Sequence, residues 1–226
     1  MKLGVLFSGG KDSGYAAYLA KKLGYKLGCL ISLASMNKDS FMFHTPAINL
    51  VKKQAKLMGL PLIILETKGN KEEELLDLKQ AIKEAVIKYK IKGIVTGAVA
   101  SVYQATRIQK ICDGLGLECF NPLWQKNQIE LLEELLKNRF EIILSSVAAY
   151  PFDKNWVGKK IDLDFIKEMK KMQEKYKINP AGEGGEFESL VINCPLFKKR
   201  LEVKIKNIVG SGNAWRAEIE NEQENN

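Results

Sequence analysis

The 226-residue sequence contains a single histidine, no Cys-x-x-Cys pair and no long apolar run. Its four cysteines are irregularly spaced, which excludes a zinc knuckle or a redox dithiol on spacing alone and favours small buried hydrophobic residues. No apolar stretch approaches the ~20 residues that cross a bilayer. The apolar run before Gly9 is too short for a secretory signal. We therefore expect a cytoplasmic protein without a membrane partner. The cysteines are Cys29, Cys112, Cys119 and Cys194.

Acidic residues are outnumbered, with 27 Asp and Glu against 35 Lys and Arg, which gives a formal net charge of +8. A basic surface attracts polyanions, so nucleic acid is one candidate partner. The lysines are spread in helical spacing, as at 52, 53 and 56 and again at 167, 170 and 171, and they form no single block. This spread favours solvated helix faces. We expect no stable complex with nucleic acid.

The first 120 residues alternate short apolar runs with helical patterns. Strands that are apolar along their length are buried on both faces, and their alternation with helices predicts a parallel sheet with right-handed crossovers. The fold class is therefore α/β, with a doubly wound parallel five-stranded sheet. Ligands bind outside the carboxyl ends of such strands. We expect strands at 3–7, 27–33, 62–65, 93–99 and 117–120. We expect helices at 14–23, from Thr45-Pro46 to Gly59, from Asn70 to Tyr89, and after the fourth strand through Ile108, Ile111 and Leu115.

The pattern changes after Pro122. The remaining chain predicts a smaller α+β unit that contains a glycine-rich turn at 179–186 and ends in a polar, frayed tail at 220–226. We place the boundary so that the domains are 1–125 and 126–226. In the second unit we expect helices at 129–137 and 162–176 and strands at 140–147, 190–193 and 201–209.

The loop after the first strand carries the densest chemical signal, Ser8-Gly9-Gly10-Lys11-Asp12-Ser13. Glycines allow a tight turn and a close approach to a ligand. Free N–H groups at the start of the following helix form a nest for phosphate. Lys11 adds a positive charge, and the hydroxyls of Ser8 and Ser13 add donors. Asp12 either caps the helix or holds a magnesium ion that bridges phosphates. The spacing is not that of a Walker A loop.

This string resembles the PP-loop of the ATP pyrophosphatase superfamily, whose fold is the adenine-nucleotide alpha hydrolase-like (HUP) type. The resemblance implies that ATP is cleaved between its α- and β-phosphates and that the loop grips the departing pyrophosphate. The implied cofactors are ATP and Mg²⁺. On this basis the first domain is an ATP-binding domain.

Three further strings resemble the diphthine–ammonia ligase family, in its short archaeal type. They are Thr96-Gly97-Ala98 and the residues that follow to Ile108, Pro122-Leu123-Trp124, and Gly182-Glu183-Gly184-Gly185-Glu186-Phe187-Glu188-Ser189. The resemblance implies ATP-dependent amidation of diphthine on elongation factor 2 through an acyl-adenylate, with release of AMP and pyrophosphate. No glutaminase domain is visible in the sequence, so free ammonium is the expected nitrogen donor. The second domain is then the substrate-binding domain.

Further site residues follow from position. Gly97 lets backbone approach the nucleotide, and Arg107 neutralises a phosphate or carboxylate unless it is a plain surface arginine. Met36 lines an adenine pocket on grounds of fold position alone. His44 precedes a helix N-terminus, which keeps it neutral and able to bind phosphate or substrate; the alternative is an exposed loop histidine.

The acidic turn offers a site for a cation. Carboxylates so close together repel unless they meet a positive partner. We expect Glu183 and Glu186 to be catalytic residues, in addition to Lys11 and Asp12. One of the two glutamates should contact magnesium, ammonium or the trimethylammonium of diphthine. An aromatic face from Phe187, Trp156 or Tyr103 can add a cation–π contact. A solvated acidic turn is the alternative.

Two other functions stay open. A tRNA-thiolating PP-loop enzyme agrees with the basic charge but needs a poised cysteine, and neither Cys112 in a helix nor Cys29 in a buried strand is poised. A non-catalytic nucleotide-binding regulator of the universal stress type has a similar fold but needs no lysine–aspartate loop. The oligomeric state is open, with a homodimer among the alternatives.

Overall fold

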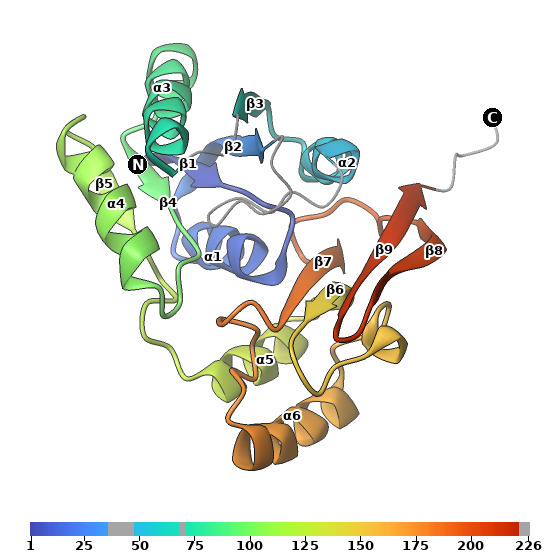
Figure 1. The fold of residues 1–226 in the computed structure, drawn as a ribbon. Coiled ribbons are helices and arrows are strands. Elements are labelled where there is room, and N and C mark those ends of the chain that lie inside the picture. The colour runs from blue at the N-terminus through green and yellow to red at the C-terminus, as the bar shows by residue number, and fades with distance from the viewer. Residues whose placement is uncertain (36–47, 68–70, 222–226) are drawn as a thin grey trace, which may run out of the picture. The chain divides into compact units, whose positions relative to one another are not determined.

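The computed structural model describes residues 1–35, 48–67 and 71–221. The chain divides into two compact units, Met1–Gln125 and Lys126–Asn226. Each unit has its own sheet. Figure 1 shows both units, and each is described by itself below.

The first unit is built on a five-stranded sheet in the order β3-β2-β1-β4-β5, in which every pairing is parallel. The order reverses at β1, which confirms the doubly wound α/β prediction. At such a switch point the loops after β1 and β4 diverge and leave room for a ligand. The strands are β1 (Lys2–Leu6), β2 (Lys26–Ser35), β3 (Leu62–Thr67), β4 (Gly93–Val95) and β5 (Glu118–Phe120).

Helices cover both faces of this sheet. In Figure 1, α3 and α4 lie on one face and α1 and α2 on the other. Apolar side chains of α3 and α4, such as Leu78, Ile82 and Ile108, pack against strand residues that include Ile31 and Ile94. The sheet is therefore buried on both faces, as its uninterrupted apolar strands predict. The helices are α1 (Lys11–Lys22), α2 (Ile48–Met58), α3 (Lys71–Tyr89) and α4 (Val102–Asp113).

Two differences in element boundaries from the sequence prediction bear on the site. β4 ends at Val95, whereas the apolar run predicted a strand to residue 99. Ala98 and Val99 are buried, but in a loop that packs into the unit. α1 begins at Lys11 instead of residue 14, so the lysine and aspartate of the loop belong to the first helical turn.

The second unit holds a four-stranded antiparallel sheet in the order β7-β6-β9-β8. α5 and α6 lie on the same side of this sheet (Figure 1). Its core includes an aromatic cluster in which Phe187 contacts Phe152 and Phe165 edge-on. The elements are α5 (Gln128–Lys137), β6 (Glu141–Ala148), the 3-10 turn Lys154–Trp156, α6 (Leu163–Tyr176), β7 (Phe187–Asn193), β8 (Val203–Ser211) and β9 (Ala214–Asn221).

The sequence prediction missed β9 and shortened β7. β8 and β9 form a hairpin whose turn includes Gly212, with a φ of 55°. A glycine with positive φ is typical of tight hairpin turns. The alternation of Trp215, Ala217 and Ile219 with charged residues is a strand signal. The sequence prediction missed this signal because these residues lie close to the polar C-terminal tail.

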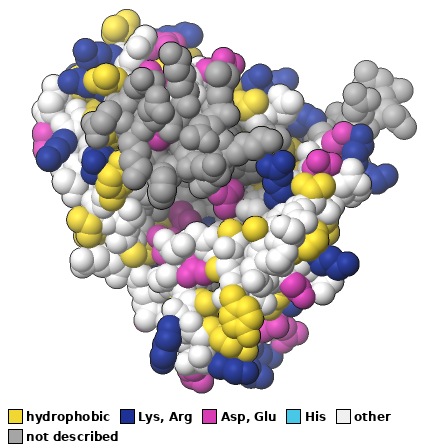
Figure 2. Space-filling view, in the orientation of Figure 1, with side chains coloured by type: hydrophobic (Ala, Val, Ile, Leu, Met, Phe, Trp, Pro, Cys, Tyr) yellow, Lys and Arg dark blue, Asp and Glu magenta, His cyan; other side chains and the backbone are white. Residues whose placement is uncertain are grey.

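Within the described part of the chain, no helix combines the length and apolar character that crossing a bilayer requires. Lysine and arginine side chains are scattered over the face in Figure 2 and interspersed with acidic ones, without one basic patch in its described part. This distribution agrees with the solvated faces expected from the lysine spacing.

Candidate functional site

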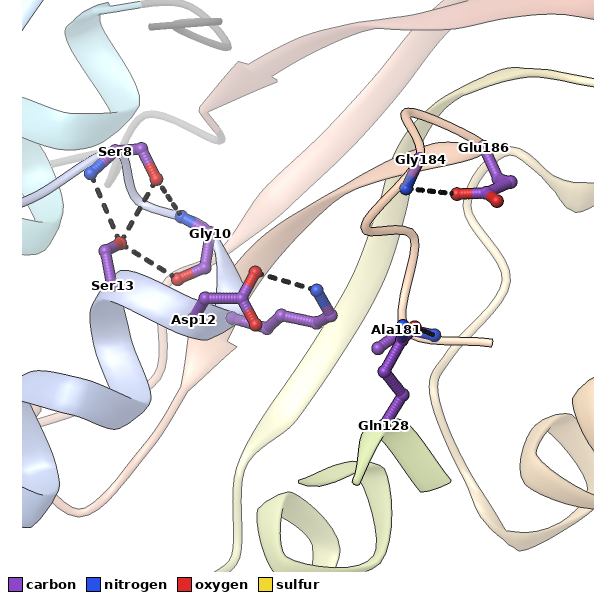
Figure 3. A network of polar contacts seen from close by, with 9 residues as sticks. Ser8, Gly10, Asp12, Ser13, Gln128, Ala181, Gly184 and Glu186 are labelled. Atoms are coloured by element: carbon purple, nitrogen blue, oxygen red, sulfur yellow. Dashed lines mark hydrogen bonds and ion pairs between the residues drawn. The ribbon is translucent and has the colours of Figure 1, made fainter. Parts of the chain in front are cut away.

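The loop between β1 and α1 is held by its own hydroxyl groups. The Ser13 hydroxyl donates to the Gly10 carbonyl (3.2 Å) and accepts from the Ser8 amide (3.2 Å). The Ser8 hydroxyl lies 3.1 Å from that of Ser13 and accepts from the Gly10 amide at 3.4 Å (Figure 3). The two serines, predicted as phosphate donors, thus shape the loop in this structure. The first intrahelical bond of α1 runs from Gly14 to Gly10, and the amides that precede it have no acceptor within the helix itself.

Lys11 and Asp12 form an ion pair at the start of α1. The Lys11 ammonium lies 2.8 Å from Asp12 Oδ2, and the lysine is almost fully buried, with 4% of its surface exposed. Asp12 is not the helix cap, since the N-cap is Gly10 and no side chain caps the helix. Asp12 Oδ1 is buried without a hydrogen-bond partner among the described residues. A buried cation and a spare carboxylate oxygen are therefore held side by side.

Gly97 brings the loop after β4 against α1. A Cβ atom at Gly97 would lie 2.7 Å from the Asp12 carbonyl carbon and 2.8 Å from the Ser13 nitrogen. The prediction was that Gly97 lets the backbone approach the nucleotide. In the structure, Gly97 lets the loop after β4 approach the backbone of α1. Gly97 thus fixes the position of the first turn of α1.

Gln54 is a site residue that sequence reasoning missed. It is fully buried on α2, and its Nε2 donates to the Gly9 carbonyl at 3.0 Å. Gly9 has a φ of 84°, and a Cβ atom there would lie 2.5 Å from Gln54 Oε1. The glutamine therefore fixes the carbonyl of a residue that has to be glycine. A buried amide in an apolar helix stripe was the available signal.

We expect Gln54→Leu to lower ATP turnover by about tenfold and the free energy of unfolding by about 1–2 kcal/mol, because a buried carbonyl loses its donor. Steady-state kinetics and denaturant unfolding measure the two effects. Gln109→Leu is the matched control, since Gln109 is exposed on α4 and its side-chain amide donates to Asp113 at the surface. Equal behaviour of the two variants would contradict the role of Gln54.

Arg107 stacks on a neighbouring aromatic ring of α4. Its guanidinium carbon lies 3.5 Å from the centre of the Tyr103 ring, which holds the side chain by a cation–π contact. The Tyr103 hydroxyl is buried without a hydrogen-bond partner among the described residues, as is Asn121 Oδ1, which follows β5. Both lie in segments that follow strands β4 and β5, at the edge where a ligand is expected.

Within the second unit, the acidic turn is organised around Glu186, which is 6% exposed. Its Oε1 accepts from the backbone amide (2.7 Å) and the side-chain amide (2.8 Å) of Asn179, and its Oε2 accepts from the Gly184 amide (2.8 Å). Figure 3 shows the Gly184 bond. Both oxygens are engaged inside the turn, which differs from the predicted contact with an external cation. Glu183 and Glu188 are partly exposed.

Two of the three predicted aromatic partners of this turn, Phe187 and Trp156, do not present open ring faces. Phe187 and Trp156 are buried, and the Lys159 ammonium lies 3.8 Å from the centre of the Trp156 ring. Phe187 packs edge-on against Phe165 in the core. The expectation that either ring binds a trimethylammonium is wrong, because strand periodicity turns Phe187 inward at the start of β7.

Two cysteines that are not spaced as a pair lie together in the first unit. A hydrogen bond joins Cys112, at the end of α4, to Cys119 on β5; this contact and burial raise the pKa of Cys112, while the same bond lowers the pKa of Cys119. Burial raises the pKa of Cys29 to about 12. Cys112 lies near the C-terminal end of its helix, and the spacing of the cysteines alone did not reveal this pair.

Some predictions lie outside the described residues. They are the assignments of Met36 and His44, the helix start at Thr45-Pro46, the cap at Asn70 and the tail after residue 221. Among the residues that the structure describes, no three or more His, Cys, Asp or Glu side chains are grouped to hold a metal ion. A magnesium ion beside Asp12 would need phosphate and water as its other ligands.

Family models match both units. The model for the diphthamide synthase N-terminal domain matches residues 1–119, and that for the C-terminal domain matches residues 127–223. The chain belongs to the diphthamide synthase family. The family resemblance drawn from the three sequence strings is thereby confirmed.

Relatives of the diphthamide synthase family align over most of the chain. A diphthine–ammonia ligase of Bos taurus is 31% identical over 231 residues, covering 92% of this chain and 85% of the relative. One from Schizosaccharomyces pombe is 32% identical over 225 residues, covering 92% of this chain but 37% of the relative. A solved structure described as a predicted subunit of tRNA methyltransferase from Methanocaldococcus jannaschii covers 89% of this chain with 19% identity and a TM-score of 0.42. The family assignment rests on the sequence matches.

Proposed function

We propose that this chain amidates diphthine on elongation factor 2 in the cytoplasm, using ATP and ammonium and releasing AMP and pyrophosphate. The observation that carries the proposal is the buried Lys11 at the first position of α1, in a loop shaped for phosphate, in a chain of this family. The first unit is then the ATP-binding domain and the second the substrate-binding domain.

ATP cleavage between the α- and β-phosphates needs positioning and charge neutralisation more than covalent help. Amides at the start of α1 and the Lys11 ammonium receive the phosphates, and Arg107 neutralises a further negative charge. Asp12 would hold a magnesium ion in place of its ion pair with Lys11. Its Oδ1, which has no hydrogen-bond partner among the described residues, fits that role. Bound magnesium would neutralise charge that develops on the phosphate oxygens.

The reaction consists of two displacements, in which first pyrophosphate and then AMP is the leaving group. A carboxylate oxygen of diphthine bonds to the α-phosphorus, and the bond from that phosphorus to the bridging oxygen breaks, so pyrophosphate leaves. The nitrogen of ammonia then bonds to the acyl carbon and loses a proton. The bond from that carbon to the oxygen now carried by AMP breaks. We assign Glu183 to hold a positive group of the substrates, either ammonium or the trimethylammonium of diphthine.

The test combines the protein with ATP, ammonium and elongation factor 2 that bears diphthine. AMP should form in step with the modified factor, whose mass should fall by the difference between a carboxyl OH and an amide NH₂. Omission of ammonium should stop amide formation. ADP as the only nucleotide product would contradict the proposal.

The contact between Cys112 and Cys119 adds to the basic charge as an observation that favours the tRNA-thiolating alternative. Against it, Cys112 is fully buried on the side of α4 that packs into the core. We expect Cys119→Ser to keep diphthamide formation within about twofold of the unmodified chain, since surface-near substitutions away from a site are usually mild. Loss of activity in this variant, with the fold retained by circular dichroism, would favour the alternative.

A further inference from the structure

A chain of hydrogen bonds crosses the second unit from one end of the glycine-rich turn to the other. The Ala181 amide donates to Gln128 Oε1 (3.0 Å), and Gln128 Nε2 donates to Asn179 Oδ1 (3.1 Å). Asn179 Nδ2 then donates to Glu186 Oε1 at 2.8 Å. Figure 3 shows the first of these bonds, together with the bond from Gly184 to Glu186.

The direction of this chain is fixed at both ends. A backbone N–H can only donate, and an ionised carboxylate can only accept. Gln128 has to turn its oxygen toward Ala181, so its NH₂ faces Asn179. Asn179 then presents its own NH₂ to Glu186. Each amide has one orientation that satisfies both of its neighbours.

These hydrogen bonds connect the glycine-rich turn to the N-terminus of helix α5. Gln128 is the first residue of α5, whose cap, Asn127, accepts from two amides of the helix. α5 buries three leucines, Leu131, Leu132 and Leu135. The turn contains Gly182 and Gly185 at positive φ, and glycine-rich backbone has many alternative conformations. At Gly184, a Cβ atom would lie 2.6 Å from Asn179 Nδ2, so the turn closes tightly on the chain.

We infer that Gln128 is a positioning residue for the amidation: through Asn179 and Glu186 it holds the turn at 179–186 in the single shape that presents Glu183 to the substrates. Glu186 is the internal acceptor at the end of this chain. The inference rests on the proposed function for its catalytic consequence, whereas the hydrogen-bond chain stands on the contacts alone.

Gln128→Glu tests the direction of the chain. The introduced carboxylate can accept from Ala181 but cannot donate to Asn179, so two acceptors face one another. Protonation restores the donor. We expect kcat/KM for diphthine-bearing elongation factor 2 to fall about 10- to 100-fold at neutral pH, because misplacement by an ångström costs rate on that order. Relative to the unmodified chain, it should recover as the pH is lowered through the pKa of the introduced carboxyl. KM for ATP should stay unchanged.

Two further variants complete the design. Gln173→Glu adds the same charge on the exposed surface of α6 and should behave as the unmodified chain at every pH. Gln128→Leu removes the donor for good and should show no recovery in acid. The new acid at the start of α5 does not weaken the helix, since negative charge is favourable there.

Amide hydrogen exchange of residues 179–186 gives a readout without substrate. Exchange should be faster in Gln128→Glu at neutral pH than in Gln173→Glu. Unchanged exchange and activity in Gln128→Glu would overturn the inference, as would equal losses in Gln128→Glu and Gln128→Leu without recovery in acid. If the unmodified chain forms no amide at all, the proposed function fails, while hydrogen exchange still decides whether Gln128 holds the turn.

Discussion

Lys11→Ala should abolish ATP cleavage while leaving the first unit folded. The side chain places a full positive charge in the first turn of α1, and it is held in a buried ion pair with Asp12. Removal of one such preorganised stabilising group typically costs about 10²–10³ in kcat. Because Lys11 also binds the triphosphate, we expect the formation of AMP and pyrophosphate to fall by at least about 10³-fold in kcat/KM.

Lys22→Ala is the matched control, since Lys22 is exposed in the last turn of the same helix. Its pyrophosphate release should match that of the unmodified chain. Circular dichroism and thermal unfolding check that both variants fold. Normal ATP cleavage by a folded Lys11→Ala variant would remove the loop from the reaction.

Gly97→Ala should impair both stability and ATP turnover. The added carbon would lie within 2.8 Å of three backbone atoms of Asp12 and Ser13, and backbone cannot move aside as a side-chain end can. Either the loop after β4 or the first turn of α1 has to shift. Overpacking of this kind costs about 1–3 kcal/mol. Displacement of Lys11 and the helix amides should lower ATP turnover by up to about 100-fold.

Gly114→Ala makes the same chemical change at the C-terminal cap of α4, where the backbone is helical with a φ of −67°. It should lower the free energy of unfolding less and leave turnover unchanged. Denaturant unfolding followed by pyrophosphate release assays separates the two effects. A Gly97→Ala variant as stable and active as Gly114→Ala would show that the two segments do not pack as described.

Local patterns accounted for most of the fold. Apolar strand runs, helix periods and the glycine loop predicted the doubly wound sheet, because each signal lies within about ten neighbouring residues. The boundary of β4 escaped prediction, since a buried apolar loop at Ala98 and Val99 has the same composition as a strand. β9 escaped because its charged outward face resembles a polar tail.

The supports of the site could not be predicted in the same way. Gln54 meets Gly9 across 45 positions of sequence, and Gln128 meets Ala181 across 53. No local spacing encodes such contacts; they follow from the packing of α2 and α5. For the same reason the role of Glu186 could not be predicted, because the sequence shows it as one of three similar acids in the turn. Only the structure shows that its carboxylate is occupied by Asn179 and Gly184.

The most direct test of the central claim follows one oxygen atom. Diphthine-bearing elongation factor 2 labelled with ¹⁸O in the diphthine carboxylate is incubated with the protein, ATP and ammonium, and the AMP is analysed by mass spectrometry. If the carboxylate attacks the α-phosphorus of ATP held by the loop of Lys11, one labelled oxygen passes to AMP for each amide that is formed. Unlabelled AMP, or label recovered in inorganic phosphate with ADP, would contradict the account.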